Sequence, residues 1–143
     1  MKFEIVIDPD CEERVVVYAK ALAPIHARLQ QLVQEENVLL GYDDGQVVKL
    51  NPYDIFYVCV VDSKVWAVCK SSRYLLKERL YQLEEKLPRG FVKINQSCLA
   101  NLDHAKRFDT SISGTLKIYF QNGDVDYVSR RQLKAVKERL GLR

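Results

Sequence analysis

The sequence is poor in the residues that build most catalytic and metal sites. Its 143 residues contain only 2 histidines and 6 glycines, and the glycines are not clustered to bind a phosphate. The motifs H-E-x-x-H and G-x-S-x-G and the P-loop are missing, which argues against the enzymes that use them. His26 and His104 stand alone, and isolated histidines are far more often structural than catalytic. We therefore expect no enzyme activity, no catalytic residue, no metal and no cofactor.

Cysteine is also used sparingly, and its spacing excludes two common sites. Cys11, Cys59, Cys69 and Cys98 include no C-x-x-C pair, so neither a zinc ribbon nor a thioredoxin-type motif is present. Cys59 and Cys69 lie in apolar segments and are expected to be buried thiols. Redox sensing by one of the cysteines is the less favoured alternative, since no neighbour in the sequence indicates a lowered thiol pKa.

Long apolar segments are missing as well. The longest apolar run is Ile55–Val61, which is far too short to cross a bilayer. The first residues carry charges and contain no apolar block that ends in small residues, so they do not resemble a signal peptide. We expect a cytoplasmic protein that does not insert into a membrane. Its length predicts one domain, with a core that forms without disulfides or metals.

Charge is distributed unevenly along the chain. Residues 1–60 hold 5 Lys and Arg against 10 Asp and Glu, whereas residues 61–143 hold 17 against 9. The range 130–143 has six basic residues and one acid, Glu138. An uneven solvated surface explains this pattern, and so does a basic half that faces an anion.

Hydrophobic periodicity predicts mainly strands, with helices that follow strands rather than alternate with them. This order argues against a doubly wound parallel sheet and favours a mainly β, α+β fold. A first helix opens at Pro24, a leucine repeat predicts the clearest helix over 75–87, and Ser129 caps the last helix. A polar connector that contains His104 precedes the last two strands. The predicted strands are 2–8, 14–20, 38–42, 46–50, 55–61, 65–69, a strand that opens at Phe91, 116–121 and 126–129. Hairpin turns are predicted at the Asp-Gly pair of Asp43–Gly45 and the Asn-Gly pair of Asn122–Asp124.

Polar side chains gather at three places where a strand ends or a helix begins. The first is the loop Asp62–Lys64, the second is the run Lys93–Ser97, and the third is Ser129–Arg131, continued by Lys134. Arg, Asn and Gln can bind base edges bidentately, whereas Lys, Ser and backbone N–H groups bind phosphates. Side chains at such positions project from a rigid scaffold, so these places are candidate contacts with nucleic acid.

The second and third groups also have purely structural explanations. Asn95–Ser97 is typical of a turn that satisfies its own backbone, and without other information this explanation is favoured. Arg130 and Arg131 would otherwise form a solvated first helical turn. Two cations near a helix N-terminus oppose the helix macrodipole, however, and this unfavourable placement favours a functional reason.

The order of these segments resembles the LytTR family of bacterial DNA-binding domains. The similarity covers about residues 38–143, and it is specific through the order and spacing of its parts. No receiver domain is evident, so the chain is similar to the stand-alone regulators of this family. The predicted β-β-α segment over residues 1–37 also resembles those regulators. The most specific parts are Phe91–Lys93 with Ser97 and Asn101–Leu102, and Asn122–Gly123 followed by Val128–Arg131.

The resemblance implies an elongated fold of small antiparallel sheets whose loops enter successive major grooves from one side of double-stranded DNA. The implied base-reading residues are Ser63, Lys64, Asn95, Gln96 and Arg131. The implied phosphate contacts are Lys93, Ser97, Arg130 and Lys134. The family often has a histidine and a basic residue where this chain has Asn95 and Gln96. We therefore expect a salt slope that is lower by about one unit for each lost phosphate contact.

The favoured function is thus a sequence-specific transcriptional regulator that binds a repeated site as a homodimer. Residues 1–37 would form a β-β-α extension, and residues 38–143 would form the DNA-binding domain. The apolar stripe of the first helix is a candidate dimer contact, unless it packs on the sheets of its own chain. This stripe consists of Ile25, Leu29, Leu32 and Val33. The controlling signal would come from a regulatory partner such as a membrane protein, or control would lie in the expression level alone. The alternative function is a protein-interaction module with vestigial DNA binding.

Overall fold

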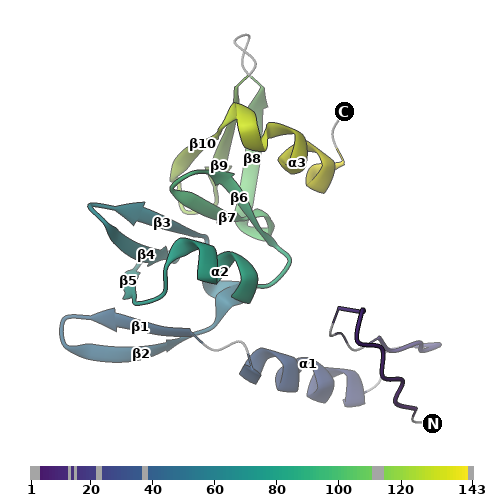
Figure 1. Cartoon of the computed structure of the whole chain (residues 1–143). Coiled ribbons are helices and arrows are strands. Elements are labelled where there is room, and N and C mark those ends of the chain that lie inside the picture. Colours follow the sequence, from purple (N-terminus) through teal and green to yellow (C-terminus); the bar gives the residue numbers. More distant parts are fainter. Residues whose placement is uncertain are drawn as a thin grey trace.

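Two antiparallel sheets dominate the fold, and helices lie around them (Figure 1). The computed structural model describes residues 4–12, 14, 16–21, 24–36, 39–110 and 115–141. The large sheet has the strand order β2-β1-β5-β4-β3-β7-β6, and the small sheet has the order β10-β9-β8. The mainly β, α+β class predicted from the sequence is confirmed. The helices in these residues are α1 (Pro24–Glu36), α2 (Leu80–Lys86) and α3 (Arg130–Leu140).

The large sheet is built mostly from hairpins. Its strands are β1 (Leu39–Asp43), β2 (Gln46–Leu50), β3 (Tyr57–Val61), β4 (Lys64–Val68), β5 (Arg73–Leu76), β6 (Phe91–Asn95) and β7 (Cys98–Asn101). Asp62 and Ser63, which join β3 to β4, both have positive φ values, of 51° and 62°. Two successive residues of this kind give the turn that matches the twist of paired strands, so the predicted hairpin closes tightly.

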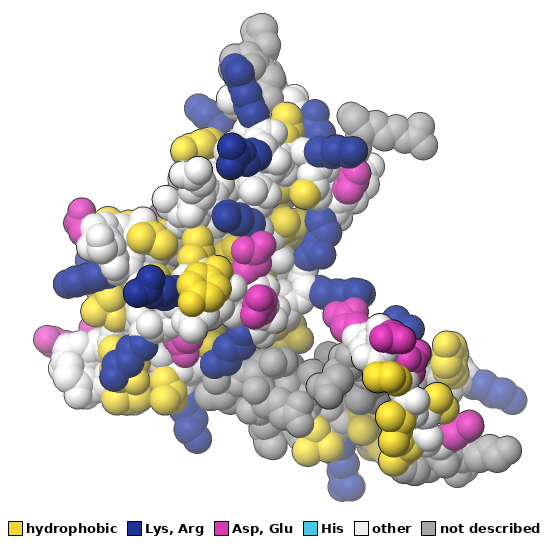
Figure 2. All heavy atoms as spheres, viewed as in Figure 1, with side chains coloured by type: hydrophobic (Ala, Val, Ile, Leu, Met, Phe, Trp, Pro, Cys, Tyr) yellow, Lys and Arg dark blue, Asp and Glu magenta, His cyan; other side chains and the backbone are white. Residues whose placement is uncertain are grey.

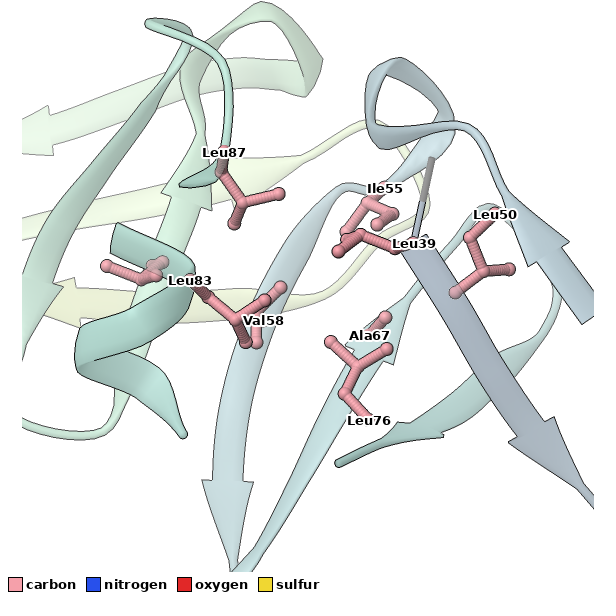
Figure 3. Close-up of a cluster of buried hydrophobic side chains, with 9 residues drawn as sticks. Leu39, Leu50, Ile55, Val58, Ala67, Leu76, Leu83 and Leu87 are labelled. Atoms are coloured by element: carbon pink, nitrogen blue, oxygen red, sulfur yellow. The ribbon is translucent and has the colours of Figure 1, made fainter. Parts of the chain in front are cut away.

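The first hydrophobic core lies between the large sheet and α2 (Figure 3). Val58 and Ala67 contribute to it from the paired strands β3 and β4, and Leu83 reaches it from α2. Burial of these apolar side chains is the main force that holds α2 against the sheet. The buried members of this core are Leu39, Leu50, Ile55, Val58, Ala67, Leu76, Leu83, Leu87 and Leu99.

A second hydrophobic core joins the small sheet to α3 and to β6 and β7. The small sheet consists of β8 (Ala105–Thr110), β9 (Leu116–Phe120) and β10 (Val125–Val128). The Asn-Gly turn between β9 and β10 was predicted from the sequence, and Gly123 there has a φ of 94°. The buried members of the core are Phe56, Ile94, Cys98, Ala100, Leu116, Ile118, Phe120, Val128 and Val136. Because α3 and β6 share this core, the start of α3 is held close to the end of β6.

The helix predicted over 75–87 is shorter than expected. Leu75 and Leu76 belong to β5, where they pair with Trp66 and Val65 of β4, and α2 begins at Leu80. Pairing with the neighbouring strand therefore outweighs the helical spacing of the leucines. Leu76 and Leu83 still reach the same core, one from a strand and one from a helix. The leucine repeat thus identified buried residues correctly, but the helix begins five residues later than the repeat predicted.

The polar connector predicted before residue 116 contains a strand. Residues Ala105–Thr110 form β8, which pairs with β9 through Phe108↔Ile118 and neighbouring residues. Most side chains of β8 are exposed, because β8 is an edge strand with a single neighbour. A strand of this kind carries no apolar alternation, so its sequence resembles a loop.

The N-terminal part also differs from the prediction. Residues 4–8, 14 and 16–20 are not in strands, although strands were predicted over 2–8 and 14–20, and positions 2, 3 and 15 lie outside the described residues. Ile5, Val6 and Ile7 are all exposed, and alternating apolar residues form a stable strand only when another strand completes their hydrogen bonds.

Helix α1 is present as predicted, and it lies apart from the two sheets (Figure 1). Its apolar stripe is not buried against them, since Ile25 and Leu32 are 39% and 59% exposed; the side chain of Val33 lies outside the described part. Leu29 lines a shallow hollow together with Val17. No helix in the described ranges is long and apolar enough to cross a membrane.

The role of α2 in the first core gives a stability prediction. Leu83 is 0% exposed, whereas Tyr81 on the same helix is 63% exposed. We expect Leu83→Ala to lower the free energy of unfolding by about 2–5 kcal/mol, because it removes buried methyl groups and leaves a cavity. We expect Tyr81→Ala to change it by about 0.5 kcal/mol or less. Urea unfolding followed by circular dichroism measures both; similar losses for the two variants would contradict this packing.

Candidate nucleic-acid interface

The turn between β6 and β7 is shaped by the side chain of Asn95. Asn95 is only 5% exposed, and each end of its amide is used inside the protein. Its Nδ2 donates to Oδ1 of Asp126 at 3.1 Å and to the carbonyl of Tyr127 at 2.9 Å. Its Oδ1 accepts the backbone N–H of Ser97 at 2.9 Å. The Asn95 side chain therefore closes the turn and also fixes it to β10.

This geometry corrects the sequence-based role of Asn95. A side chain that reads a base needs free donors and acceptors at the surface, and those of Asn95 are occupied by the protein. The hydrogen bond from the backbone N–H of Ser97 to Asn95 forms a turn in which a side chain satisfies the local backbone. This turn is the structural alternative that the sequence predicted. Gln96, by contrast, is exposed at the tip of the turn.

The other two predicted residues of this segment have different degrees of exposure. Ser97 is exposed, and its carbonyl accepts the backbone N–H of Val60 at 2.8 Å. Lys93 is half-buried in β6, where it pairs with Leu99 of β7. The register of β6 shifts between Lys93 and Asn95. An irregularity of this kind re-aims the side chains that follow it, which here are those of the turn.

The N-terminus of α3 lies directly beside this turn. The backbone N–H of Ser129 donates to the carbonyl of Ile94 at 2.8 Å, so the start of α3 is tied to the end of β6. Ser129 is the N-cap residue, as predicted, although its side chain makes no capping hydrogen bond. Arg130, Arg131 and Lys134 are all exposed. Their side chains are therefore accessible to a ligand within the first five residues of α3.

The β3–β4 turn lies on the same end of the large sheet. Ser63 and Lys64 are exposed at its tip. Strand β3 pairs with β7 up to Cys59↔Cys98, and the Val60–Ser97 hydrogen bond continues that pairing to the β6–β7 turn. Two hydrogen bonds therefore connect the three elements that carry the predicted polar groups, and Asn95, a member of the second group, is buried.

The charge of this region is predominantly basic. In the view of Figure 2, Lys and Arg side chains dominate the part formed by α3 and β8–β10, whereas Asp and Glu side chains gather near the N-terminal segment. Two acidic residues, one in β10 and one in the turn before it, accept hydrogen bonds within the protein. Asp126 accepts the Asn95 amide, and Asp124 accepts the Tyr57 hydroxyl at 2.8 Å. Burial raises the pKa of Tyr57, and its hydrogen bond to Asp124 raises it further, so this tyrosine stays neutral.

Sequence reasoning missed Asp126 and Tyr127 as partners of the interface. They lie 31 and 32 residues from Asn95 in the chain, and no local pattern marks them. The Asn-Gly hairpin signal was the nearest hint, because it showed that β10 returns beside β9. The position of β10 against the β6–β7 turn follows only from the tertiary fold.

The Asn95 network gives a second prediction. We expect Asn95→Ala to lower the free energy of unfolding by about 1–3 kcal/mol, because it removes three part-buried hydrogen bonds, to Asp126, Tyr127 and Ser97. We expect the neighbouring exposed substitution Gln96→Ala to cost about 0.5 kcal/mol or less. Chemical denaturation of both variants measures the difference. Equal stability of Asn95→Ala and the parent protein would show that the amide does not hold the turn.

Comparisons with known proteins point to one family. Residues 45–141 match the LytTr DNA-binding domain. An uncharacterized HTH-type transcriptional regulator of Staphylococcus aureus strain NCTC 8325 is 31% identical over 110 residues, which cover 77% of this chain and 75% of the relative. Its counterpart in the bovine strain RF122 is 30% identical over the same length and shares.

A solved structure shares the fold. The LytTr DNA-binding domain from Bacillus cereus superposes with a TM-score of 0.70 and 20% sequence identity, covering 73% of this chain and 97% of that one. At this identity the likeness concerns the fold alone. The family match and the staphylococcal relatives together confirm the resemblance found in the sequence, and the chain belongs to the LytTR family of DNA-binding domains.

Proposed function

We propose that the protein is a sequence-specific transcriptional regulator that binds double-stranded DNA through three adjacent loops. The observation that carries this proposal is the joining of the three polar groups by the Val60–Ser97 and Ser129–Ile94 hydrogen bonds. Loops that are fixed to one another in this way present their side chains in a constant spacing. The names of the staphylococcal relatives as transcriptional regulators support the same function.

Within this proposal, the side chains divide into two kinds of contact. Ser63, Lys64, Gln96 and Arg131 are exposed at the tips and would read base edges in the major groove. Lys93, Ser97, Arg130 and Lys134 would bind phosphates and set the register of the protein on the duplex. Asn95 would act as a positioning residue, because its amide holds the turn that carries Gln96.

The spacing of the loops favours contacts in successive grooves from one side of the DNA. The β3–β4 hairpin and the start of α3 flank the β6–β7 turn on its two sides, as the hydrogen bonds from Val60 and Ser129 require. Contacts arranged in such a row extend over more DNA than a single loop would reach. They do not require a helix to lie in the groove. Action on chromosomal DNA would place the protein in the bacterial cytoplasm.

We further propose that residues 1–37 contribute a homodimer contact. Ile25 and Leu32 expose apolar surface on α1, and α1 lies apart from the sheets of its own chain (Figure 1). An amphipathic helix with an uncovered apolar face gains stability by packing against another such face. A second copy supplies an identical face, and a dimer would match a repeated DNA site.

The base-reading role of Arg131 is tested by DNA affinity. We expect Arg131→Ala to weaken binding to a selected site by about 1–3 kcal/mol and to relax the base preference at one position. Lys70 is a matched control, because it is an exposed cation at the opposite end of β4. Fluorescence anisotropy with duplexes selected from a random-core pool measures both variants. An equal loss in Lys70→Ala would indicate that only overall charge matters.

The phosphate role of Lys134 is tested by the salt dependence. We expect Lys134→Ala to lower the slope of log affinity against log salt by about one unit, because one released counterion is lost. Its base preferences should stay those of the parent protein. An unchanged slope in salt titrations of folded Lys134→Ala would remove this residue from the proposed interface.

The dimer contact is tested by deletion. We expect a chain without residues 1–37 to keep its sheets and to sediment as a monomer, while the full chain sediments as a dimer. Its affinity for a repeated site should fall, because the second binding event is no longer intramolecular. Analytical ultracentrifugation and anisotropy give both results. A shortened chain that remains folded and dimeric would contradict the proposal.

A further inference from the structure

Two cysteines lie directly opposite each other in the large sheet, beside the proposed DNA-binding turn. Strands β3 and β7 are antiparallel, and their register pairs Cys59 with Cys98. The side chains of directly opposed residues lie on the same face of a sheet. Both cysteines are free thiols; Cys59 is half-buried, and Cys98 is 1% exposed.

The hydrogen-bond pattern shows which kind of pair they form. Val60 donates to Ser97, and Asn101 donates to Phe56, so the hydrogen-bonded pairs of these strands alternate with the pair Cys59↔Cys98. Opposed residues in a non-hydrogen-bonded pair have Cα atoms about 4.5 Å apart. A disulfide spans Cα separations of about 4.4–6.8 Å. The backbone therefore holds the two cysteines at a separation that a disulfide can bridge without moving a strand.

We propose that Cys59 and Cys98 form a dithiol that a small soluble disulfide oxidises to a cross-strand disulfide, and that this bond weakens DNA binding by restraining the β6–β7 turn, whose Ser97 directly precedes Cys98. The second half of this proposal rests on the proposed function. The first half concerns the chemistry of the pair alone, and it is tested separately.

The oxidation is a pair of thiol–disulfide exchanges. The Cys59 thiolate attacks one sulfur of the small disulfide, forms a mixed disulfide and releases one small thiolate. The Cys98 thiolate then attacks the Cys59 sulfur and releases the second small thiolate. The two cysteines lose two electrons, which reduce the small disulfide to two thiols, and their two protons pass to those leaving groups. Cys59 reacts first because it is the more exposed of the two.

The surroundings make both thiols slow to react. Burial raises the pKa of Cys59; Asp126 and Asp124 of β10 and its turn raise it further, and Arg73 of β5 lowers it. Burial raises the pKa of Cys98 well above its usual range, and the charges of the neighbouring Asp126 and Cys59 raise it further. The exchange is therefore slow near neutral pH, and its rate rises with the thiolate fraction as the pH increases.

The position of Cys98 connects the thiol pair to the β6–β7 turn. Cys98 directly follows Ser97, whose N–H donates to Oδ1 of Asn95 and whose carbonyl accepts the N–H of Val60, the residue after Cys59. A disulfide fixes the torsion angles of the two side chains that it joins, so it restrains the backbone next to Cys98. Through Ser97 this restraint reaches the turn that carries Gln96.

The first experiment measures the bond itself. The full chain with Cys11→Ser and Cys69→Ser, which keeps only the opposed pair, is incubated with oxidised glutathione and analysed by intact mass. We expect the loss of two hydrogen atoms, no retained glutathione, and reversal by dithiothreitol. The same chain with Cys98→Ser should keep one glutathione on Cys59. A glutathione adduct that persists with Cys98 present would overturn the proposal, and so would unmodified thiols in both proteins.

The second experiment measures the coupling. Anisotropy titrations compare the reduced and disulfide forms of the Cys11→Ser, Cys69→Ser chain on the same duplex. We expect roughly tenfold weaker binding by the disulfide form, because a restrained turn presents Gln96 less favourably to a base edge. Equal affinities would overturn the coupling. A reduced protein that binds no DNA would overturn the proposed function and the coupling with it, whereas the disulfide is decided by mass alone.

Discussion

The side-chain amide of Asn95 joins two segments that are far apart in the sequence, the β6–β7 turn and β10. It closes the β6–β7 turn through Ser97, and it binds β10 through Asp126 and Tyr127. The N–H of Ser129 then ties the start of α3 to the carbonyl of Ile94, one residue before Asn95. A buried amide that loses these partners pays the desolvation cost of every group left unpaired, so this arrangement is strongly preferred over alternatives. The β6–β7 turn and the start of α3, which carry two of the three polar groups, are held side by side in this way.

The two hydrophobic cores explain how such a small contact can be rigid. One core fixes α2 on the large sheet, and the other fixes α3 and the small sheet on β6 and β7. The β6–β7 turn lies where β6, β7 and β10 meet, so residues of both cores support its backbone. The relatives are named as HTH-type regulators, yet α2 and α3 are separated here by strands β6 to β10. Loops and the end of one helix, rather than a pair of consecutive helices, therefore present the exposed polar groups.

The sequence predicted those parts of the fold that carry a local signal. The Asp-Gly and Asn-Gly turns, the β3–β4 hairpin and the last helix all follow from adjacent residues. The edge strand β8 and the strand β5 were missed, because pairing with neighbours distant in the chain decides them. At the interface, exposure of Gln96 and Arg131 followed from their positions, whereas the burial of Asn95 did not. An asparagine is the same residue in the sequence whether its side chain is exposed or buried. Only the positions of Asp126 and Tyr127 in the fold show that Asn95 is buried.

Hydroxyl-radical footprinting can show whether the three loops on one side of the protein read DNA together. The duplex is selected from a random-core pool, and the Arg131→Ala and Gln96→Ala variants are compared with the parent protein. We expect protected stretches on one side of the duplex, and each variant should lose a different stretch while the others remain. Uniform weakening of every stretch by both variants, or no selected sequence at all from a folded protein, would contradict it.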